Sequence, residues 1–182
     1  MSGDVDDAER REDARPVVIS VAPGLLLGNF AAAVDPATLA RHGVTQTLNL
    51  AVNLDAPPLT LPEGVVVRRA KIGLIDGPGN HPLHVAAAAL SFDGMLAQTA
   101  PGKPGYPAHR AGALLVHCRG GRSRSVAVAA LWLARRDPAA RRDPDAAVET
   151  LRRRRKLGPD QPCEAMLAAM REAARLLESG RM

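Results

Sequence analysis

Apolar runs separated by turn residues recur along the chain and predict strands mixed with helices. Strands are expected as a pair within 16–28 around the turn Ala22–Gly24, and then at 45–51, 65–72 and 113–117. Helices are expected from Asp35–Pro36 to Gly43, at 84–98, at 124–135, from Asp143–Pro144 to about Leu157, and from Pro159–Asp160 to about Glu178.

The most apolar of these elements are expected at the centre of the fold. The run 113–117 suits a strand in the middle of a buried sheet, and the helix 124–135 is apolar on every side beyond its first turn. The pattern predicts one α/β domain over 16–179, with a central, mostly parallel twisted sheet flanked by helices. The charged segment 1–15 is expected to be a disordered tail. The segment 99–112 holds three prolines and three glycines and is expected to be a surface loop.

Composition narrows the class of protein. The chain has 182 residues, a hydrophobic content of 46% and a charged content of 24%, which is ordinary for one globular domain. No apolar run approaches the roughly 20 residues that cross a bilayer, and residues 1–15 lack the apolar middle of a signal peptide, so a cytoplasmic location is expected. The net charge of +5 favours an anionic partner. With only 2% aromatic residues for base stacking, no nucleic-acid partner is expected.

The chemistry is concentrated in one segment, His117–Ser125, which reads His-Cys-Arg-Gly-Gly-Arg-Ser-Arg-Ser. It joins the predicted buried strand to the predicted buried helix. A loop that turns into a helix N-terminus points several backbone N–H groups inward and forms an anion site, reinforced by the helix dipole. Such a site should keep Cys118 ionised at neutral pH and should bind a phosphate dianion above it.

The neighbouring residues suit phosphoryl transfer. Arg124 can fork its guanidinium onto two phosphate oxygens. Gly120 and Gly121 permit positive φ and close backbone approach. Ser125 can donate a hydrogen bond to the sulfur when it leaves. The remaining candidate phosphate-binding residues of the segment are His117, expected to order the loop through backbone bonds, Arg119, Arg122 and Ser123.

The segment resembles the dual-specificity phosphatase signature His-Cys-x-x-Gly-x-Ser-Arg-Ser, and every fixed position is present. The upstream segments 23–28 and 43–50 are also similar to that family, and the resemblance covers about residues 17–177. It implies the phosphatase fold, a phosphocysteine intermediate on Cys118 and no metal or other cofactor. It also implies a general acid on a separate loop, and Asp76 occupies the matching position.

Two departures from the family accompany this resemblance. Asp76 and Cys118 lie further apart than is usual, and we assign the extra length to the 99–112 loop. The family usually has Pro-Asn before its last helix, where this chain has Pro159–Asp160. The sequence leaves open whether the phosphate loop is braced there.

The sequence also allows other interpretations of these residues, most of them without a catalytic role. Cys118 can be a buried structural cysteine, and a rhodanese-like protein uses a similar loop but lacks the Gly-x-Ser-Arg-Ser tail. Asp76 before glycine can be a turn residue, and Asp93 is a weaker candidate acid on a predicted helix. Cys163 can be an ordinary helix residue or can form a disulfide with oxidised Cys118. The run Arg152–Arg155 can be a solvated helix face or a contact with an acidic membrane.

The expected substrate is a protein phosphorylated on Tyr, Ser or Thr. Arg119 and Arg122 leave a phosphoinositide or another anionic phospholipid open as the alternative, because they add positive charge beside the bound phosphate. An RNA 5′-phosphatase is disfavoured by the scarcity of aromatic residues. A binding module without turnover is the alternative of another class, and Cys118, Arg124 and Asp76 together argue against it. A monomer is expected.

Overall fold

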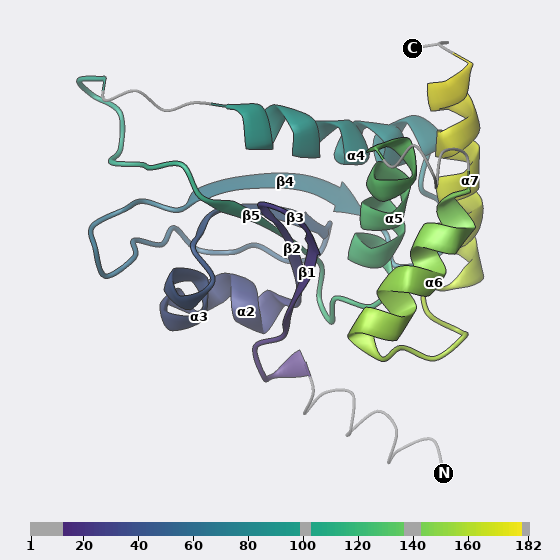
Figure 1. The fold of residues 1–182 in the computed structure, drawn as a ribbon, viewed down its shortest axis with the longest axis horizontal. Coiled ribbons are helices and arrows are strands. Elements are labelled where there is room, and N and C mark those ends of the chain that lie inside the picture. Colours follow the sequence, from purple (N-terminus) through teal and green to yellow (C-terminus); the bar gives the residue numbers. More distant parts are fainter. Residues whose placement is uncertain (1–12, 99–102, 137–142, 180–182) are drawn as a thin grey trace.

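The computed structural model describes residues 13–98, 103–136 and 143–179, and within them a five-stranded sheet lies between two layers of helices (Figure 1). The strands are β1 (Val18–Ala22), β2 (Leu25–Gly28), β3 (Val44–Ala51), β4 (Arg68–Leu74) and β5 (Ala113–His117). The helices are α2 (Phe30–Val34), α3 (Pro36–Arg41), α4 (Pro82–Ala97), α5 (Arg124–Arg136), α6 (Pro144–Arg155) and α7 (Glu164–Glu178).

The sheet has the strand order β1-β2-β5-β3-β4. β1 and β2 form an antiparallel hairpin, while β2, β5, β3 and β4 pair in parallel, which confirms the predicted mostly parallel sheet. The carboxyl ends of parallel strands meet at one edge. The segments that follow β3, β4 and β5 therefore start side by side, although they are far apart in the sequence.

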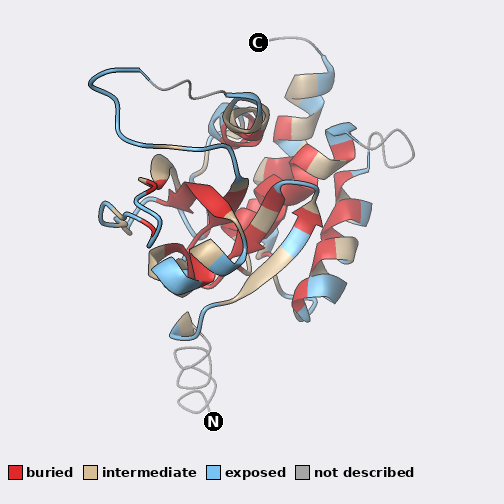
Figure 2. Ribbon diagram, turned by 60° about the vertical axis from the view of Figure 1, so that its left-hand side comes forward, coloured by how far each residue is buried: buried red, intermediate tan, exposed pale blue. Residues whose placement is uncertain are grey.

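Both faces of the central strand β5 are buried, as its apolar run predicted. Leu114 and Val116 join the larger core beneath α4, α5, α6 and α7, whereas Leu115 joins a smaller core with α2 and α3. Figure 2 shows the burial concentrated at the centre of the molecule, and β3, β5 and α5 are buried along nearly their whole length. The rigid strand β5 thus feeds directly into the equally buried α5, which fixes both ends of the loop between them.

Several element boundaries differ from the sequence expectation. β4 starts at Arg68 rather than at Val65. α7 starts at Glu164, so the expectation of a helix start at Pro159–Asp160 is wrong. The reason is Pro162, because a proline disfavours the helical conformation of the residue before it. α2 was not predicted: its N-cap Asn29 accepts a hydrogen bond from the Ala32 N–H at 3.0 Å.

The expected tail lies mostly outside the described residues, which begin at residue 13. Asp13 and Arg15 are placed, and both contact the domain: the Asn29 side-chain amide donates to their carbonyl oxygens, at 3.3 and 2.7 Å. At least these two residues of the expected tail therefore lie against the domain. Of the expected surface loop, 99–102 lie outside the described part, and 103–112 contain neither helix nor strand. None of the helices within the described ranges combines the length and the apolarity needed to cross a bilayer.

Candidate active site

The segment Cys118–Ser123, which we call the Cys118 loop, leaves β5 and enters α5 at the edge where β3 and β4 also end. It forms one wall of a cavity of about 350 Å³. The residues that line this cavity are Asp76, Cys118, Arg119, Gly120, Arg122, Ser123, Asp160, Gln161 and Cys163. The structure thus brings the predicted nucleophile and the predicted acid to one cavity, from segments that are separate in the sequence.

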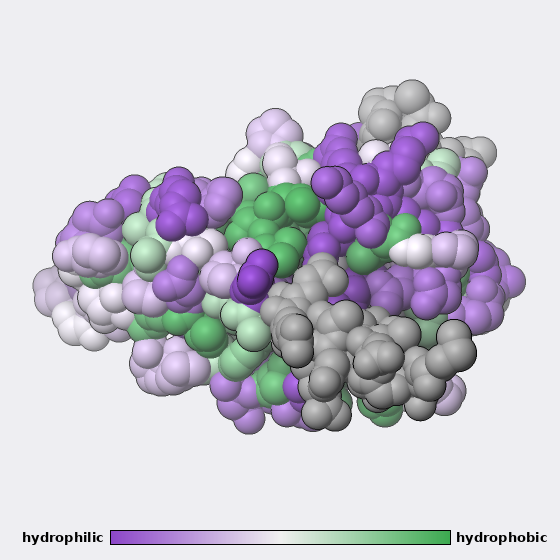
Figure 3. Space-filling view, turned by 90° about the horizontal axis from the view of Figure 1, so that it is seen from below, coloured by the Kyte–Doolittle hydropathy of each residue, from purple (hydrophilic) through white to green (hydrophobic). Residues whose placement is uncertain are grey.

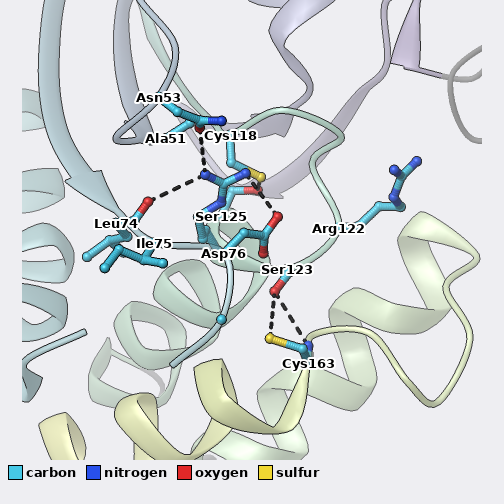
Figure 4. A network of polar contacts seen from close by, with 12 residues as sticks. Ala51, Asn53, Leu74, Ile75, Asp76, Cys118, Arg122, Ser123, Ser125 and Cys163 are labelled. Atoms are coloured by element: carbon cyan, nitrogen blue, oxygen red, sulfur yellow. Dashed lines mark hydrogen bonds and ion pairs between the residues drawn. The ribbon is translucent and has the colours of Figure 1, made fainter. Parts of the chain in front are cut away.

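Cys118 lines the cavity, and Ser125 lies next to it (Figure 4). The Cys118 Sγ atom is 3.3 Å from the Ser125 Oγ atom, and both residues are buried. Ser125 belongs to the first turn of α5, where the backbone N–H groups have no partners within the helix. The sulfur therefore faces a hydroxyl donor and the positive end of a helix dipole.

Arg124 opens α5, and its side chain is only 2% exposed. Its Nη1 group donates to the Leu74 carbonyl oxygen at 3.4 Å and to Asn53 Oδ1 at 3.5 Å, at the ends of β4 and β3. Its Nη2 group donates to Asp76 Oδ2 at 3.0 Å. The Arg124 Nε atom is buried and has no hydrogen-bond partner among the described residues. The guanidinium is thus oriented by a backbone carbonyl, an amide and a carboxylate.

Asp76 is half exposed and sits on the loop that follows β4, which we call the Asp76 loop (residues 75–80). Asn80 holds this loop closed: its Oδ1 accepts from the Ile75 N–H at 2.8 Å, and its Nδ2 donates to the carbonyl oxygens of Ile75 and Gly77 at 2.8 and 3.1 Å. Sequence reasoning missed Asn80, although asparagine in a glycine-rich turn commonly bonds nearby backbone. The Asp76 side chain therefore extends from a loop held by Asn80 to the Arg124 guanidinium, and Figure 4 shows it on the side of Cys118.

The alternative acid Asp93 lies elsewhere. It sits on α4, where its carboxylate accepts from Trp132 Nε1 at 2.8 Å and from Arg136 Nη1 at 2.6 Å. Those contacts give Asp93 a structural place between α4 and α5. Of the two candidate acids, Asp76 lines the cavity and Asp93 does not.

His117 is fully buried behind the nucleophile. Its Nδ1 atom is 3.2 Å from the Cys118 carbonyl oxygen, so an Nδ1–H tautomer donates to that oxygen. Burial lowers the pKa of His117 to about 4, against the smaller opposing effect of the Cys118 contact. The ring is therefore neutral near pH 7, and its place suits ordering of the backbone rather than proton transfer.

Close packing requires a glycine at position 121, whereas a Cβ atom at position 120 would meet only the ends of the Asp13 and Arg122 side chains. Gly121 has φ +66°, and a Cβ atom there would lie 2.6 Å from the Gly28 carbonyl oxygen. A Cβ atom on Gly120 would lie 2.6 Å from Asp13 Oδ1. The Arg119 carbonyl oxygen accepts from the Phe30 N–H at 2.8 Å, which ties the same loop to α2.

The two arginines inside the loop have different surroundings. Arg119 is exposed at the cavity. Arg122 forms an ion pair with Asp13, with Nη1 and Oδ1 2.9 Å apart. The carboxylate offsets part of the positive charge that the sequence places beside the cavity, and Figure 4 shows Arg122 set apart from Cys118.

The far end of the Cys118 loop is held by Cys163, the N-cap residue of α7. The Cys163 N–H donates to Ser123 Oγ at 3.4 Å, and the Ser123 hydroxyl lies 3.6 Å from Cys163 Sγ. Asp160, at the position where the family has asparagine, lines the cavity. A backbone N–H of the neighbouring Cys163 thus braces the loop, a contact that composition could not reveal.

Comparisons with known proteins agree with this geometry. No model of a protein family matches the chain. Human dual specificity phosphatase 28 is 32% identical over 133 residues, which cover 71% of this chain and 66% of that protein, slightly less than two thirds of its length.

Solved structures share the fold. The structure of human DUSP28 has a TM-score of 0.66 at 24% identity and covers 90% of this chain and 97% of its own. A mouse putative dual specificity phosphatase complexed with zinc tungstate has a TM-score of 0.66 at 24% identity, covering 92% of each chain. PTPMT1 in complex with PI(5)P has a TM-score of 0.59 at 13% identity, covering 91% of this chain and 99% of its own. Together with the curated relative, they show that this chain belongs to the dual-specificity phosphatases of the cysteine-based tyrosine phosphatase superfamily.

Proposed function

We propose that this protein is a metal-independent phosphomonoester hydrolase that works through a phosphocysteine on Cys118. The observation that supports it best is that Cys118 and Asp76, from two separate segments, line one cavity at the edge of the sheet, where Asp76 accepts a hydrogen bond from Arg124. A structural cysteine would not need an oriented guanidinium and a closed acid loop beside it.

In the first step, the Cys118 thiolate attacks phosphorus and the bond from phosphorus to the leaving oxygen breaks. Arg124 and the backbone N–H groups of the Cys118 loop stabilise the charge on the equatorial oxygens. Asp76, in its protonated form, gives its proton to the leaving oxygen. A bound phosphate competes with Asp76 for the Arg124 guanidinium, so substrate binding frees the carboxyl group to turn toward the leaving group.

In the second step, the Asp76 carboxylate takes a proton from water, the water oxygen attacks phosphorus and the phosphorus–sulfur bond breaks. The sulfur leaves as a thiolate. Ser125 is placed to donate a hydrogen bond to it, at the 3.3 Å separation seen between Oγ and Sγ. His117 holds the Cys118 carbonyl oxygen through both steps and transfers no proton.

Turnover of p-nitrophenyl phosphate without added metal tests this proposal. We expect the wild-type chain to hydrolyse it and Cys118→Ser to lose turnover while keeping the circular dichroism spectrum and inorganic phosphate binding. Cys163→Ser is the matched control, because it makes the same atom exchange at the other cysteine of the cavity. Unchanged turnover in Cys118→Ser would remove Cys118 as the nucleophile.

For the substrate, we propose a protein phosphorylated on Tyr, Ser or Thr, handled in the cytoplasm by a monomer. An anionic phospholipid is the second candidate, supported by the exposed Arg119 at the cavity and by the fold shared with PTPMT1, whose structure is a complex with PI(5)P. The Arg122–Asp13 ion pair weakens that support. Turnover of a panel of phosphopeptides and phosphoinositides by the wild-type protein separates the two candidates. If the double variant with Arg119→Ala and Arg122→Ala loses the same share of turnover on both classes of substrate, the positive charges of these arginines do not favour a phospholipid.

A binding module without turnover remains the alternative of another class. Complete lack of hydrolysis, together with retained binding of a phosphopeptide, would favour it. The presence of an oriented Asp76 argues against it, because a module that only binds phosphate has no use for a proton donor at the leaving group.

A further inference from the structure

In the run Arg152–Arg155, expected as a solvated face or a membrane contact, three of the four arginines make contacts with other segments. Arg152 donates to the carbonyl oxygens of Gln161 and Pro159 at 2.6 and 2.8 Å. Arg154 donates to two carbonyl oxygens of β1, at 3.1 and 3.0 Å. Figure 3 shows that the surface on the side of α6 and α7 is strongly hydrophilic, and Arg153 is exposed there.

Arg155 is the buried member of the run, with 8% exposure. It lies four residues after Leu151, on the stripe of α6 that faces the core. Its Nη2 group donates to the Gly120 carbonyl oxygen at 3.2 Å. A buried guanidinium is costly to desolvate, so its place against the wall of the cavity calls for an explanation.

The peptide that Arg155 contacts is the one in the Cys118 loop most free to rotate. It joins Gly120 to Gly121, and neither residue has a Cβ atom to restrict the torsions on either side. Because a trans peptide is planar, its C=O and N–H groups point in opposite directions. Gly120 lines the cavity while the Arg155 guanidinium is buried within the protein, so a Gly120 carbonyl held by Arg155 leaves the Gly121 N–H directed away from Arg155.

We propose that Arg155 is a positioning residue that fixes the orientation of the Gly120–Gly121 peptide, so that the loop presents an N–H donor rather than a carbonyl oxygen to a bound oxyanion. This role rests on the proposed function, because that function identifies the bound oxyanion as the phosphate of the substrate. A residue of α6, outside the Cys118 loop, thereby takes part in phosphate binding. Loss of Arg155 leaves the peptide free to turn its carbonyl dipole toward the anion, which repels it.

Binding of inorganic phosphate, measured by titration calorimetry in a buffer free of other oxyanions, tests this without requiring turnover. Arg155→Met removes the guanidinium and fills its space with an unbranched apolar chain. We expect its phosphate Kd to rise roughly tenfold or more, the effect of one lost hydrogen bond to a charged group. Arg153→Met, the same exchange at an exposed position of α6, should stay within about twofold of the wild type.

Arg155→Lys separates orientation from charge, because lysine keeps the positive charge but lacks the planar fork and ends short of the Gly120 carbonyl. We expect Arg155→Lys to bind phosphate several-fold more weakly than the wild type. Full wild-type phosphate affinity in Arg155→Lys would overturn the proposal, since the positive charge alone would then suffice. This comparison decides the question even if Arg155→Met does not fold. Wild-type affinity in a folded Arg155→Met would overturn it equally. Phosphate binding without hydrolysis of p-nitrophenyl phosphate would refute the proposed function but not this role of Arg155.

Discussion

Replacing His117 by asparagine should change how the stability of the fold depends on pH. His117 is fully buried, and burial lowers its pKa from 6.5 to about 4. In the unfolded chain the ring takes up a proton below about pH 6.5, whereas the folded protein resists protonation until about pH 4. The free energy of unfolding therefore falls as the pH drops through this window and is unaffected by His117 above it.

The magnitude follows from the size of the window. At about 1.4 kcal/mol for each pH unit, the neutral, buried His117 costs the fold about 3 kcal/mol of stability between pH 7 and pH 4. His117→Asn removes the titration while keeping an amide donor near the Cys118 carbonyl oxygen. The variant is expected to be less stable than the wild type at pH 7, because it leaves space in the core, and the difference should shrink by about 3 kcal/mol toward pH 4.

Urea unfolding followed by far-ultraviolet circular dichroism, at several values between pH 4 and pH 8, measures this difference. His84→Asn is the control, since it changes an exposed histidine on α4 and should leave the pH dependence as in the wild type. Carboxylates titrate in all three proteins and cancel in the comparison. Parallel curves for the wild type and His117→Asn would refute the reasoning that His117 is neutral because it is buried.

The remaining predictions concern the cavity. Asp76→Asn should lower kcat by roughly 10²–10⁴ for phosphopeptides, and less for p-nitrophenyl phosphate, whose leaving group needs little protonation; a full-rate variant removes Asp76 from the mechanism. Ser125→Ala should slow only breakdown of the phosphocysteine, by roughly ten- to a hundredfold, and stopped-flow should show a burst of nitrophenol; an unchanged kcat without a burst contradicts this role. Asp13→Asn should free the charge of Arg122 from its ion pair and lower KM for doubly phosphorylated peptides at low salt; equal KM values would show that the pair does not matter for binding.

The core of the site could be predicted because its chemistry is local. Cys118, Arg124 and Ser125 belong to one short segment whose residue types and spacing already specify a loop between a strand and a helix N-terminus. The order of apolar runs likewise predicted β5 and α5, since both are buried on all sides and their sequences show it. Asp76 was identified through the resemblance to the phosphatase family, and the parallel sheet accounts for its position beside the Cys118 loop.

The supporting contacts could not be predicted, because each joins segments distant in the sequence. Asp13 belonged by composition to a charged tail, yet it pairs with Arg122. Arg155 belonged to a basic run whose charge suggested solvent, yet its spacing from Leu151 places it on the buried stripe of α6. That spacing was a usable signal, and the strong charge of the run obscured it. The predicted start of α7 at Pro159–Asp160 is wrong because Pro162 disfavours the helical conformation at the residue before it.

The most direct test of the account is whether phosphate becomes attached to Cys118 during turnover. Rapid mixing with a phosphorylated substrate, acid quenching and peptide mass spectrometry should find one phosphoryl group on the peptide that carries Cys118, at higher occupancy in Ser125→Ala than in the wild type. Hydrolysis that proceeds with the sulfur of Cys118 never modified would contradict the account, whatever the affinity of the cavity for phosphate.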